Sequence, residues 1–383
     1  MIRILHTIGS LERGGIQQWI RNIVVASKDR GLHHAILIRK QAAGEDGDEI
    51  ERDGGQVHDD YTGGGLLMCV AGAMRNIRPS LVDVVHCHGE HYSTAIYAAV
   101  GRWRGVPIVA HAHNVRPPSR TALNKLYDAI VTHVTCRFAT ELLATSEEAG
   151  AAMFGRVWKE RRKGARVLHC GIRTPVINDL ARKATREELG IPASARVMGA
   201  VGRLTRAKNI GRLLEICAEM RRDERNVYVL VVGDGPLREG LSLQAVRLGI
   251  EDKVRFVGAQ KDVAPYYSAM DVLVMPSINE GWGLSAIEAQ CAGVPAVVST
   301  ALPVGVILSP ISTKRLDVCE KDRVWIDSIV ECDRYGREEI ASTARKAASD
   351  RGLLIETSIA LLEAAYRAML CKAPAVGGEA CNN

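Results

Sequence analysis

Aromatic residues and long apolar runs are what this sequence has least of. Of 383 residues only 17 are aromatic, namely 5 Trp, 9 Tyr and 3 Phe. The cores must therefore consist mostly of Val, Ile, Leu and Ala, as strand-and-helix layers often do. No apolar run reaches the roughly 18 residues that a membrane-spanning helix needs. The opening MIRILHTIG is interrupted too soon for a signal peptide and predicts a buried first strand.

The ten cysteines also lack any arrangement that would give them a special role. They occur singly, with no C-x-x-C pair and no Cys/His spacing typical of a zinc site, so reduced thiols in the cytoplasm are expected. The net charge of +6 is too small to indicate nucleic-acid binding, and no nucleic-acid-binding motif is present. It suits an anionic substrate or membrane. Residues 116–137 and 159–166 carry cations, and apolar residues such as Leu123, Leu126 and Trp158 stand beside these cations. This combination predicts peripheral contact with the inner face of the plasma membrane.

The rest of the sequence alternates between short apolar strands and helical segments in two successive series. A hydrophobic content of 47% is sufficient for two cores. Because helices separate the strands, both sheets should be parallel and covered on both faces. We therefore predict an α/β fold with two Rossmann-like, doubly wound domains, residues 1–172 and 173–350. A helix should occupy residues 351–372, the tail 373–383 should be disordered, and residues 304–327 show no regular pattern.

The most informative stretch is VLVMPSINEGWGLSAIEAQCAGVPAVVST, residues 272–300. It begins with an apolar run that suits a buried parallel strand, turns at Pro276, and continues through a Gly-rich loop into a helix from Leu284. Gly293 suits the helix C-terminus, and a second short strand follows. The loop therefore precedes a helix N-terminus, where free N–H groups and the helix dipole favour an electron-rich ligand.

Two carboxylates frame this loop. Glu280 stands at its entrance, and Glu288 follows with seven residues between them. Both are expected to face one crevice above the carboxyl ends of the strands, where open α/β sheets bind ligands. Spacing alone does not distinguish this arrangement from a solvated loop glutamate and a surface helix glutamate.

Basic residues gather at the entrance of another helix. The strand at residues 197–201 leads into GRLTRAKNIGRLLEIC, in which Asn209 can cap the helix that follows. Arg203, Arg206 and Lys208 would then stand at the positive end of that helix, which disfavours cations unless an anion binds among them. An anion site among these residues is therefore one interpretation, and solvated charge on a loop, with three flexible basic side chains avoiding one another in water, is the other.

Two further Gly-rich turns precede helices. Gly14 and Gly15 stand at the entrance of the first helix and allow a phosphate or a sugar to approach the backbone. The turn GDGPLRE, residues 233–239, fails as a dinucleotide fingerprint, because Arg238 stands where the third glycine should be. No P-loop lysine motif is present.

Histidines are concentrated in HCHGEHYS, so a metal site of His86, His88 and His91 has to be considered. No carboxylate or second cluster stands at a recognised ligand spacing, and no metal site is predicted. His113, in AHAHN, follows the strand at residues 108–110 and is a candidate site residue, with His111 as the alternative if the register shifts by two residues.

The Glu280–Glu288 stretch resembles the E-x(7)-E signature of the retaining family-four glycosyltransferases, including its E-G-x-G core at Gly281 and Gly283. The string around Arg203 and Lys208 is similar to the G-R-L-x-x-x-K-N motif of that family, and AHAHN to its strand-end histidine. IEAQCAGVPAVVST and the segment 139–155 resemble most the branch that builds capsular and exopolysaccharides. The chain departs from the family at Trp282, where Phe or Leu is commoner, and at HCGIR, which replaces N-G-I/V-D.

This resemblance implies a GT-B enzyme with an interdomain cleft, in which the second domain holds most of the donor and residues 351–372 cross back onto the first. The implied reaction transfers a hexose from a nucleoside-diphosphate sugar, expected to be a UDP-sugar, to a lipid-linked saccharide with retention of configuration. No metal and no cofactor are implied. The implied site residues are Arg203 and Lys208 on the diphosphate, Glu280 and His113 on the sugar, Glu288 on the ribose, and the donor-binding positions Gly14, Gly15, Gly281, Trp282, Gly283 and Leu284.

Two alternatives stay open. One is a nucleotide-sugar epimerase of the same architecture, which would need no acceptor. The other is a catalytically silent partner that binds a sugar nucleotide within a polysaccharide assembly complex. The sequence identifies neither the sugar nor the acceptor nor the linkage.

Overall fold

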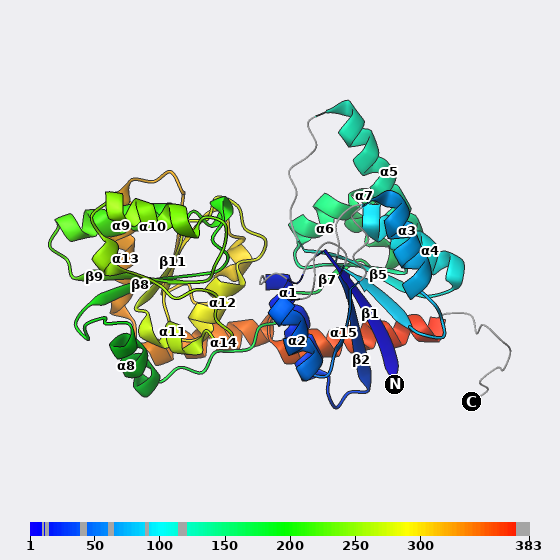
Figure 1. Cartoon of the computed structure of the whole chain (residues 1–383), viewed down its shortest axis with the longest axis horizontal. Coiled ribbons are helices and arrows are strands. Elements are labelled where there is room, and N and C mark those ends of the chain that lie inside the picture. Colours follow the sequence, from blue (N-terminus) through cyan, green and yellow to red (C-terminus); the bar gives the residue numbers. More distant parts are fainter. Residues whose placement is uncertain are drawn as a thin grey trace. The chain divides into compact units, whose positions relative to one another are not determined.

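The computed structural model describes residues 1–9, 11, 15–38, 44–59, 65–88, 92–113 and 121–372. The chain forms two compact units. The first comprises Met1–Gly171 together with the segment that begins at Ile355, and the second comprises Ile172–Leu354. Figure 1 shows that each unit has a central sheet with helices on its faces.

The first unit contains a seven-stranded parallel sheet in the order β3-β2-β1-β4-β5-β6-β7. Chain order reverses between β1 and β4, as in doubly wound folds. The apolar residues of these short strands are buried, as the sequence predicts for parallel strands covered on both faces. The strands are β1 Ile2–Ile8, β2 Leu32–Ile38, β3 Gln56–Asp59, β4 Val84–Cys87, β5 Ile108–Ala112, β6 Glu141–Ala144 and β7 Arg166–Val167.

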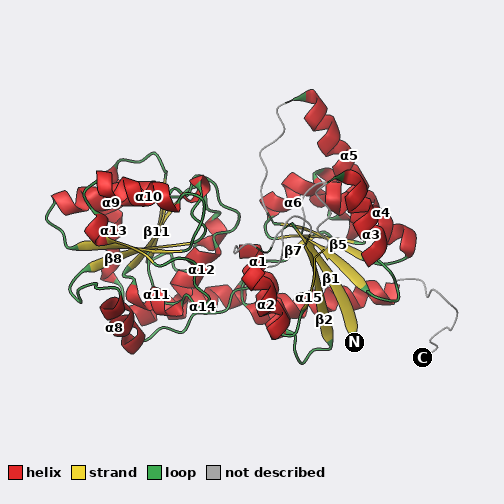
Figure 2. Ribbon diagram, viewed as in Figure 1, coloured by secondary structure: helices red, strands yellow, loops and turns green. Residues whose placement is uncertain are grey.

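Helices cover both faces of this sheet (Figure 2). One face packs against residues of α3 to α7 in an apolar core. On the other, α1 lies against the C-terminal helix α15, and Trp19 Nε1 donates to Ser358 Oγ at 3.2 Å. Ser146 caps α6, since its hydroxyl accepts from Ala149 N at 3.1 Å. The helices are α1 Gly15–Ala26, α2 Gly44–Arg52, α3 Leu66–Asn76, α4 Tyr92–Arg104, α5 Ala122–Phe138, α6 Glu147–Phe154, α7 Arg156–Lys159, the 3₁₀ turn η1 Arg162–Gly164 and α15 Ile355–Lys372.

The second unit repeats the same winding with six parallel strands in the order β10-β9-β8-β11-β12-β13. One apolar core lies under α9, α10 and α13, and another lies under α11, α12 and α14 (Figure 1). The strands are β8 Arg196–Val201, β9 Val227–Val232, β10 Val254–Phe256, β11 Val272–Met275, β12 Ala296–Ser299 and β13 Thr313–Leu316. The helices are α8 Asp179–Glu188, η2 Arg206–Lys208, α9 Ile210–Arg222, α10 Arg238–Arg247, η3 Glu251–Lys253, α11 Ala264–Ala269, α12 Leu284–Cys291, η4 Val304–Val306, α13 Asp322–Glu331, η5 Cys332–Arg334 and α14 Arg337–Asp350.

The strand–loop–helix–strand unit predicted at residues 272–300 is confirmed as β11, α12 and β12. Gly293 adopts φ +75° after α12, and a Cβ there would lie 2.3 Å from the carbonyl oxygen of Arg337, so only glycine fits. The irregular pattern assigned to residues 304–327 is wrong in part. The edge strand β13 lies within this range, where Lys314 and Arg315 interrupt the apolar pattern, and α13 begins at Asp322.

No helix among the described residues is both long and apolar enough to cross a membrane.

Candidate active site

The strand order of the second unit makes the carboxyl ends of β8 and β11 the candidate ligand site. These two neighbours lie where chain order reverses, which is the position at which open α/β sheets bind ligands. The loop after β8 carries Arg203 and Lys208. The loop after β11 carries Glu280 and leads into α12. The two segments that sequence analysis singled out therefore meet at one edge of one sheet.

Hydrogen bonds join these two loops directly. The N–H of Ile278 donates to Ala207 O at 2.8 Å, and the side-chain amide of Asn209 donates to Pro276 O at 3.0 Å. Asn209 therefore occupies the N-cap position of α9 without capping it by its side chain, and its φ is +52°. The prediction of a side-chain cap is wrong, because the amide bonds the neighbouring loop instead.

An ion pair between Lys208 and Glu280 lies between the loops. Lys208 Nζ is 2.5 Å from Glu280 Oε2, and the side chains are 21% and 12% exposed. The hydroxyl of Ser277 donates to the same oxygen at 3.4 Å. A Cβ on Gly202 would lie 3.5 Å from Lys208 Nζ, so the lysine packs against this glycine. The expectation that only a bound anion could balance this cation is wrong for Lys208, because Glu280 supplies the negative charge.

Close backbone contact fixes the start of the Arg203–Lys208 loop. Gly202 N donates to Val232 O, and Leu204 N donates to Asp234 O, each at 2.9 Å. Gly233 has φ +137°, and a Cβ on it would lie 2.0 Å from the carbonyl oxygen of Gly202. The glycine of GDGPLRE therefore serves this backbone approach rather than a dinucleotide. Arg203 follows this turn and is exposed.

The loop between Glu280 and α12 ends in a positive-φ glycine. Gly283 occupies the N-cap position of α12 with φ +72°, and no side chain caps the helix. Its N-terminal amides therefore begin beside Glu280, whose Cγ would lie 3.7 Å from a Cβ on Gly283. Trp282 is buried at 9% exposure and packs against Gly305, whose Cβ would meet the indole at 2.8 Å. Gly281 and Leu284, on either side, are half-buried.

Glu288 lies in the second turn of α12 and contacts Tyr267. The tyrosine hydroxyl donates to Glu288 Oε2 at 2.9 Å. Burial raises the pKa of Glu288 to about 7, and the hydrogen bond from Tyr267 opposes that shift. The surface-glutamate alternative is therefore wrong, since this carboxyl is half-buried and held by a specific donor.

The first unit contains a buried layer of imidazoles on the sheet face opposite its apolar core. Residues two apart on a strand share a face, so His86 and His88 lie together and so do His111 and His113. His6 of β1 and His34 of β2 join them, and the indole of Trp19 lies across the layer. Hydrogen bonds join ring nitrogens of His34 and His6 and of His6 and His88 at 2.8 Å, of His88 and His113 at 2.9 Å, and of His86 and His111 at 3.1 Å. His86 also shares a hydrogen bond of 2.6 Å with the hydroxyl of Tyr366.

Hydrogen bonds connect four of these rings in one series, from His34 through His6 and His88 to His113. The partners at the two ends of this series fix which nitrogen of each of the four rings carries the proton. The hydroxyl of Ser27 donates to Ile23 O at 2.5 Å, so its oxygen accepts from His34 Nε2 at 3.0 Å. A neutral imidazole has one donor and one acceptor. Because His34 donates to Ser27 through Nε2, its Nδ1 accepts from Nε2 of His6, and His88 and His113 must donate through Nε2 in the same way. At the far end, Nε2 of His113 donates to His88, and Nδ1 lies 3.6 Å from Cys170 Sγ. Burial lowers the pKa of His6, His86, His88 and His111 well below the ordinary value, which keeps the rings neutral.

Three imidazoles at a time come close enough to consider a shared metal ion. Within these groups the bonded nitrogens of His6 and His88 are 2.8 Å apart, and those of His88 and His113 are 2.9 Å apart. Two ligands of one tetrahedral zinc, each at 2.0–2.1 Å, would be separated by about 3.3 Å. The rings are thus arranged for hydrogen bonds with one another. His91 and Gly14, both considered from the sequence, lie outside the described residues, and Gly15 begins α1.

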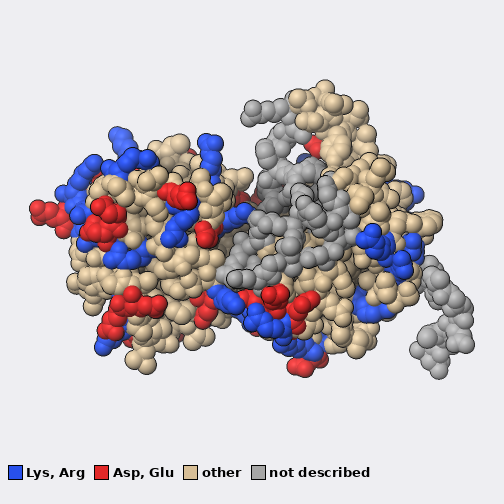
Figure 3. Space-filling view, in the orientation of Figure 1, with Lys and Arg blue, Asp and Glu red and all other residues tan. Residues whose placement is uncertain are grey.

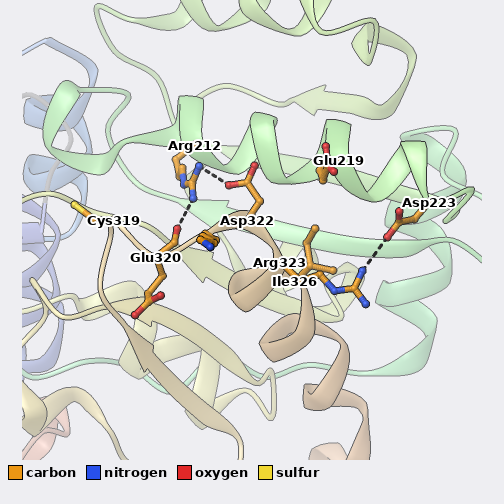
Figure 4. Close-up of a pocket in the computed structure, with 9 residues that line it drawn as sticks. Arg212, Glu219, Asp223, Cys319, Glu320, Asp322, Arg323 and Ile326 are labelled. Carbon is orange, nitrogen blue, oxygen red and sulfur yellow. Dashed lines mark hydrogen bonds and ion pairs between the residues drawn. The ribbon is translucent and has the colours of Figure 1, made fainter.

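A surface pocket of about 560 Å³ lies elsewhere in the second unit, between α9 and the start of α13. Figure 4 shows Arg212 reaching toward Asp322, at 2.5 Å, and Arg323 toward Asp223, at 3.4 Å. These charges compensate one another, and no residue singled out from the sequence lines the pocket. On the visible face of this unit, Lys and Arg are interspersed with Asp and Glu (Figure 3), so the net positive charge forms no single basic surface there.

Fold and site together define a class of protein. Two doubly wound units, the second carrying a lysine and a glutamate at its switch point beside a helix N-terminus, are the architecture of GT-B glycosyltransferases. Two family models match: "Glycosyl transferase 4-like domain" over residues 14–171 and "Glycosyl transferases group 1" over residues 181–317. The chain is a glycosyltransferase of the GT-B, family-four type, and the predicted enzyme, a hexosyltransferase, is confirmed.

Individual relatives agree. EpsF of Bacillus subtilis, whose name assigns it to the glycosyltransferases, is 27% identical over 347 residues, which cover 88% of each chain. A D-inositol 3-phosphate glycosyltransferase of Streptomyces avermitilis is 36% identical over 253 residues, which cover 60% of this chain and 53% of the relative.

Solved structures confirm the predicted fold. The structure of HepE from Anabaena with UDP and glucose superposes with a TM-score of 0.79 at 19% identity, covering 96% of this chain and all of HepE. WaaG, a glycosyltransferase involved in lipopolysaccharide biosynthesis, gives a TM-score of 0.68 at 17% identity, covering 96% of this chain and 99% of WaaG.

Proposed function

We propose that this enzyme transfers a hexosyl group from a nucleoside-diphosphate sugar, preferably a UDP-sugar, to a lipid-linked saccharide in polysaccharide biosynthesis, with retention of anomeric configuration. The observation that carries the proposal is the Lys208–Glu280 pair between the loops after β8 and β11. It places a cation and a carboxylate beside the N-termini of α9 and α12. HepE, one of the structural neighbours, has been solved with UDP and with UDP-glucose, which supports the choice of donor.

The chemistry assigned to this site is electrostatic. As the bond between the anomeric carbon and the diphosphate breaks, negative charge grows on the leaving phosphate. The ammonium of Lys208, the guanidinium of Arg203 and the amides at the start of α12 would stabilise that charge. Glu280 holds Lys208 in place and would accept hydrogen bonds from donor-sugar hydroxyls, while Glu288 would accept them from the ribose.

For a retaining reaction, the hydrogen bonds of Glu280 and Glu288 favour attack from one face over a double displacement. A double-displacement reaction needs a carboxylate free to attack the anomeric carbon. Glu280 Oε2 is bonded to Lys208 and Ser277, and Glu288 Oε2 to Tyr267. We therefore propose that the acceptor attacks from the same face as the leaving phosphate, which accepts the acceptor's proton. The ring of His113 contacts His88 at 2.9 Å and the thiol of Cys170 at 3.6 Å. It could contact the sugar only by giving up one of these two contacts, and the contact with the thiol is the weaker.

The lipid-linked acceptor is proposed for the first unit, which carries apolar side chains on its surface. Leu123, Leu126 and Ile130 of α5 are 76%, 59% and 54% exposed, and Leu67 of α3 is 82% exposed. Trp158 is 1% exposed, so its predicted role at the membrane is wrong. The α5 residues, interspersed with cations such as Lys125 and Arg137, suit the surface of an anionic bilayer.

The proposal is tested by incubating the full chain with a panel of nucleotide sugars and a lipid-linked saccharide fraction in anionic or neutral vesicles. We expect one UDP-hexose to label the lipid fraction, more rapidly in anionic vesicles, and NMR of the product to show the donor's anomeric configuration. Release of free epimerised sugar without acceptor would contradict the proposal in favour of an epimerase. Donor binding without turnover would indicate a silent partner, and an inverted product would contradict retention.

A further inference from the structure

We propose that Tyr267 is a positioning residue for the donor: its hydroxyl holds Oε2 of Glu288, so that Oε1 is left to accept hydrogen bonds from the ribose. This inference rests on the ribose role assigned to Glu288 in the proposed function. It adds a residue that no sequence motif indicated, since Tyr267 lies 21 residues before Glu288 and on a different helix.

The contact between the two helices is specific. The hydroxyl oxygen of Tyr267 lies 2.9 Å from Glu288 Oε2 and 3.2 Å from the carbonyl oxygen of Ser285. A phenol has one proton, and the shorter contact to the stronger acceptor takes it. The hydroxyl therefore spans the first and second turns of α12. Because α12 begins beside Glu280, this single contact connects the ribose carboxylate with the helix end assigned to the diphosphate.

The helix that carries Tyr267 is itself held firmly. The last carbonyl groups of α11 accept hydrogen bonds from three arginines: Arg182 to Ser268 and Met270, Arg186 to Ala269, and Arg337 to Ser268. Cations at a helix C-terminus are also favoured by the helix dipole. The ring of Tyr267 is fully buried in the core below α12 and α14. The hydroxyl therefore has little freedom to leave Glu288, as preorganisation of a binding group requires.

The contact also affects the charge of the carboxyl. Burial raises the pKa of Glu288 to about 7, and the donated hydrogen bond lowers it. Besides Tyr267, the buried thiol of Cys291 feels the charge of Glu288, and the backbone carbonyl of Cys291 accepts from Arg345 of α14. Without the hydroxyl, the carboxyl should stay protonated to higher pH and accept fewer hydrogen bonds from a ribose. Removing the hydroxyl of Tyr267 should therefore lower the affinity for the donor, and the size of this effect should depend on pH.

The test compares the wild type with Tyr267→Phe, Glu288→Gln and the control Tyr266→Phe, the adjacent and less buried tyrosine. UDP affinity is measured by calorimetry between pH 6 and 9, and KM and kcat for the donor sugar are measured in parallel. In Tyr267→Phe we expect Kd and KM at pH 7 to rise about tenfold, the size of one hydrogen bond to a charged group. The loss should shrink toward pH 9, kcat should change little, and Tyr266→Phe should match the wild type.

Each outcome separates the inference from the proposed function. If Glu288→Gln binds UDP as the wild type does, the ribose role of Glu288 is wrong. If Glu288→Gln weakens binding but Tyr267→Phe does not, or weakens it equally at every pH, only the positioning role is wrong. If Tyr267→Phe does not fold, infrared spectra of the wild type decide, with the band of the ionised Glu288 carboxylate assigned by Glu288→Gln. We expect the frequency of a carboxylate that accepts a hydrogen bond, and the frequency of an unbonded carboxylate would contradict the inference.

Discussion

At the scale of single residues, the Lys208–Glu280 pair shows how a structure can reverse an argument made from sequence. A lysine at a helix N-terminus is unfavourable by itself. On that basis, replacement of Lys208 by Met should leave the stability unchanged or slightly raised. The carboxylate of Glu280 lies 2.5 Å away and is only 12% exposed, so the lysine is balanced within the protein.

Removing one partner of this pair should therefore destabilise the second unit. Lys208→Met leaves a mostly buried carboxylate without its cation, and we expect a loss of about 1–3 kcal/mol in unfolding free energy. Glu280→Gln should lose a similar amount. The double variant should lose less than the sum, by at least about 0.5 kcal/mol, because neither charge is then left alone. Urea unfolding of the four proteins measures this coupling.

Arg206→Met is the matched control, because Arg206 lies in the same 3₁₀ turn and is exposed. Its effect should stay within about 0.5 kcal/mol. Additive effects of Lys208→Met and Glu280→Gln would show that the pair does not form. Both variants should also lose about 10²–10³ in transfer rate if the site acts on the departing diphosphate.

Which residues could be foreseen depended on whether their role shows in local sequence. Glu280 and Lys208 lie in Gly-rich segments beside helix starts, and both were identified from those segments. Tyr267 left no such signal, because its role arises only when α11 packs beside α12. His6 and His34 left a weak one. Each is a polar residue at an inward-facing strand position, and only the sheet order shows that they join His86 and His88.

At the scale of elements, the imidazole layer across β1, β2, β4 and β5 makes the first unit sensitive to acid. Burial lowers the pKa of His34 to about 4 and that of His6, His86, His88 and His111 well below the ordinary value. The unfolded chain takes up protons near pH 6.5, while the folded chain does not. Stability is therefore complete above about pH 6.5 and falls as the pH drops below it.

We expect the melting temperature to fall steeply between pH 6.5 and 5. One pH unit below 6.5, each buried histidine costs about 1.4 kcal/mol, so a few together approach the whole stability of a domain. The melting temperature is measured across this range for the wild type, His34→Gln and the control His33→Gln, an exposed neighbour on β2. His34→Gln should flatten the curve and His33→Gln should not. A wild-type melting temperature that is constant from pH 7.5 to 5 would contradict the account.

Sequence periodicity predicted most elements because their apolar runs are long enough to show. α12 begins at Leu284 as predicted, and the strand predicted over residues 197–201 is β8, Arg196–Val201. The C-terminal helix, predicted over residues 351–372, begins four residues later at Ile355. β13 was missed because its Lys314 and Arg315 interrupt the apolar pattern on an edge strand. Edge strands tolerate charge, and position in the sheet is a property that sequence order does not reveal.

At the scale of the whole molecule, the chain repeats one doubly wound topology twice and uses the two copies differently. Both sheets reverse chain order between their first and fourth strands. In the first unit, neutral imidazoles occupy the strands on either side of that point. In the second, a charged pair and two helix N-termini occupy the corresponding edge. This difference supports the assignment of the anionic donor to the second unit.

Hydrogen–deuterium exchange of the full chain with and without UDP tests this assignment most directly. We predict slower exchange in residues 202–209 and 280–288, the loops joined by Lys208 and Glu280. Both should lose this protection in Lys208→Met at the same UDP concentration. Protection confined to the first unit, or to the pocket around Arg212 and Arg323, would contradict the central claim, as would binding by calorimetry that leaves both loops unprotected.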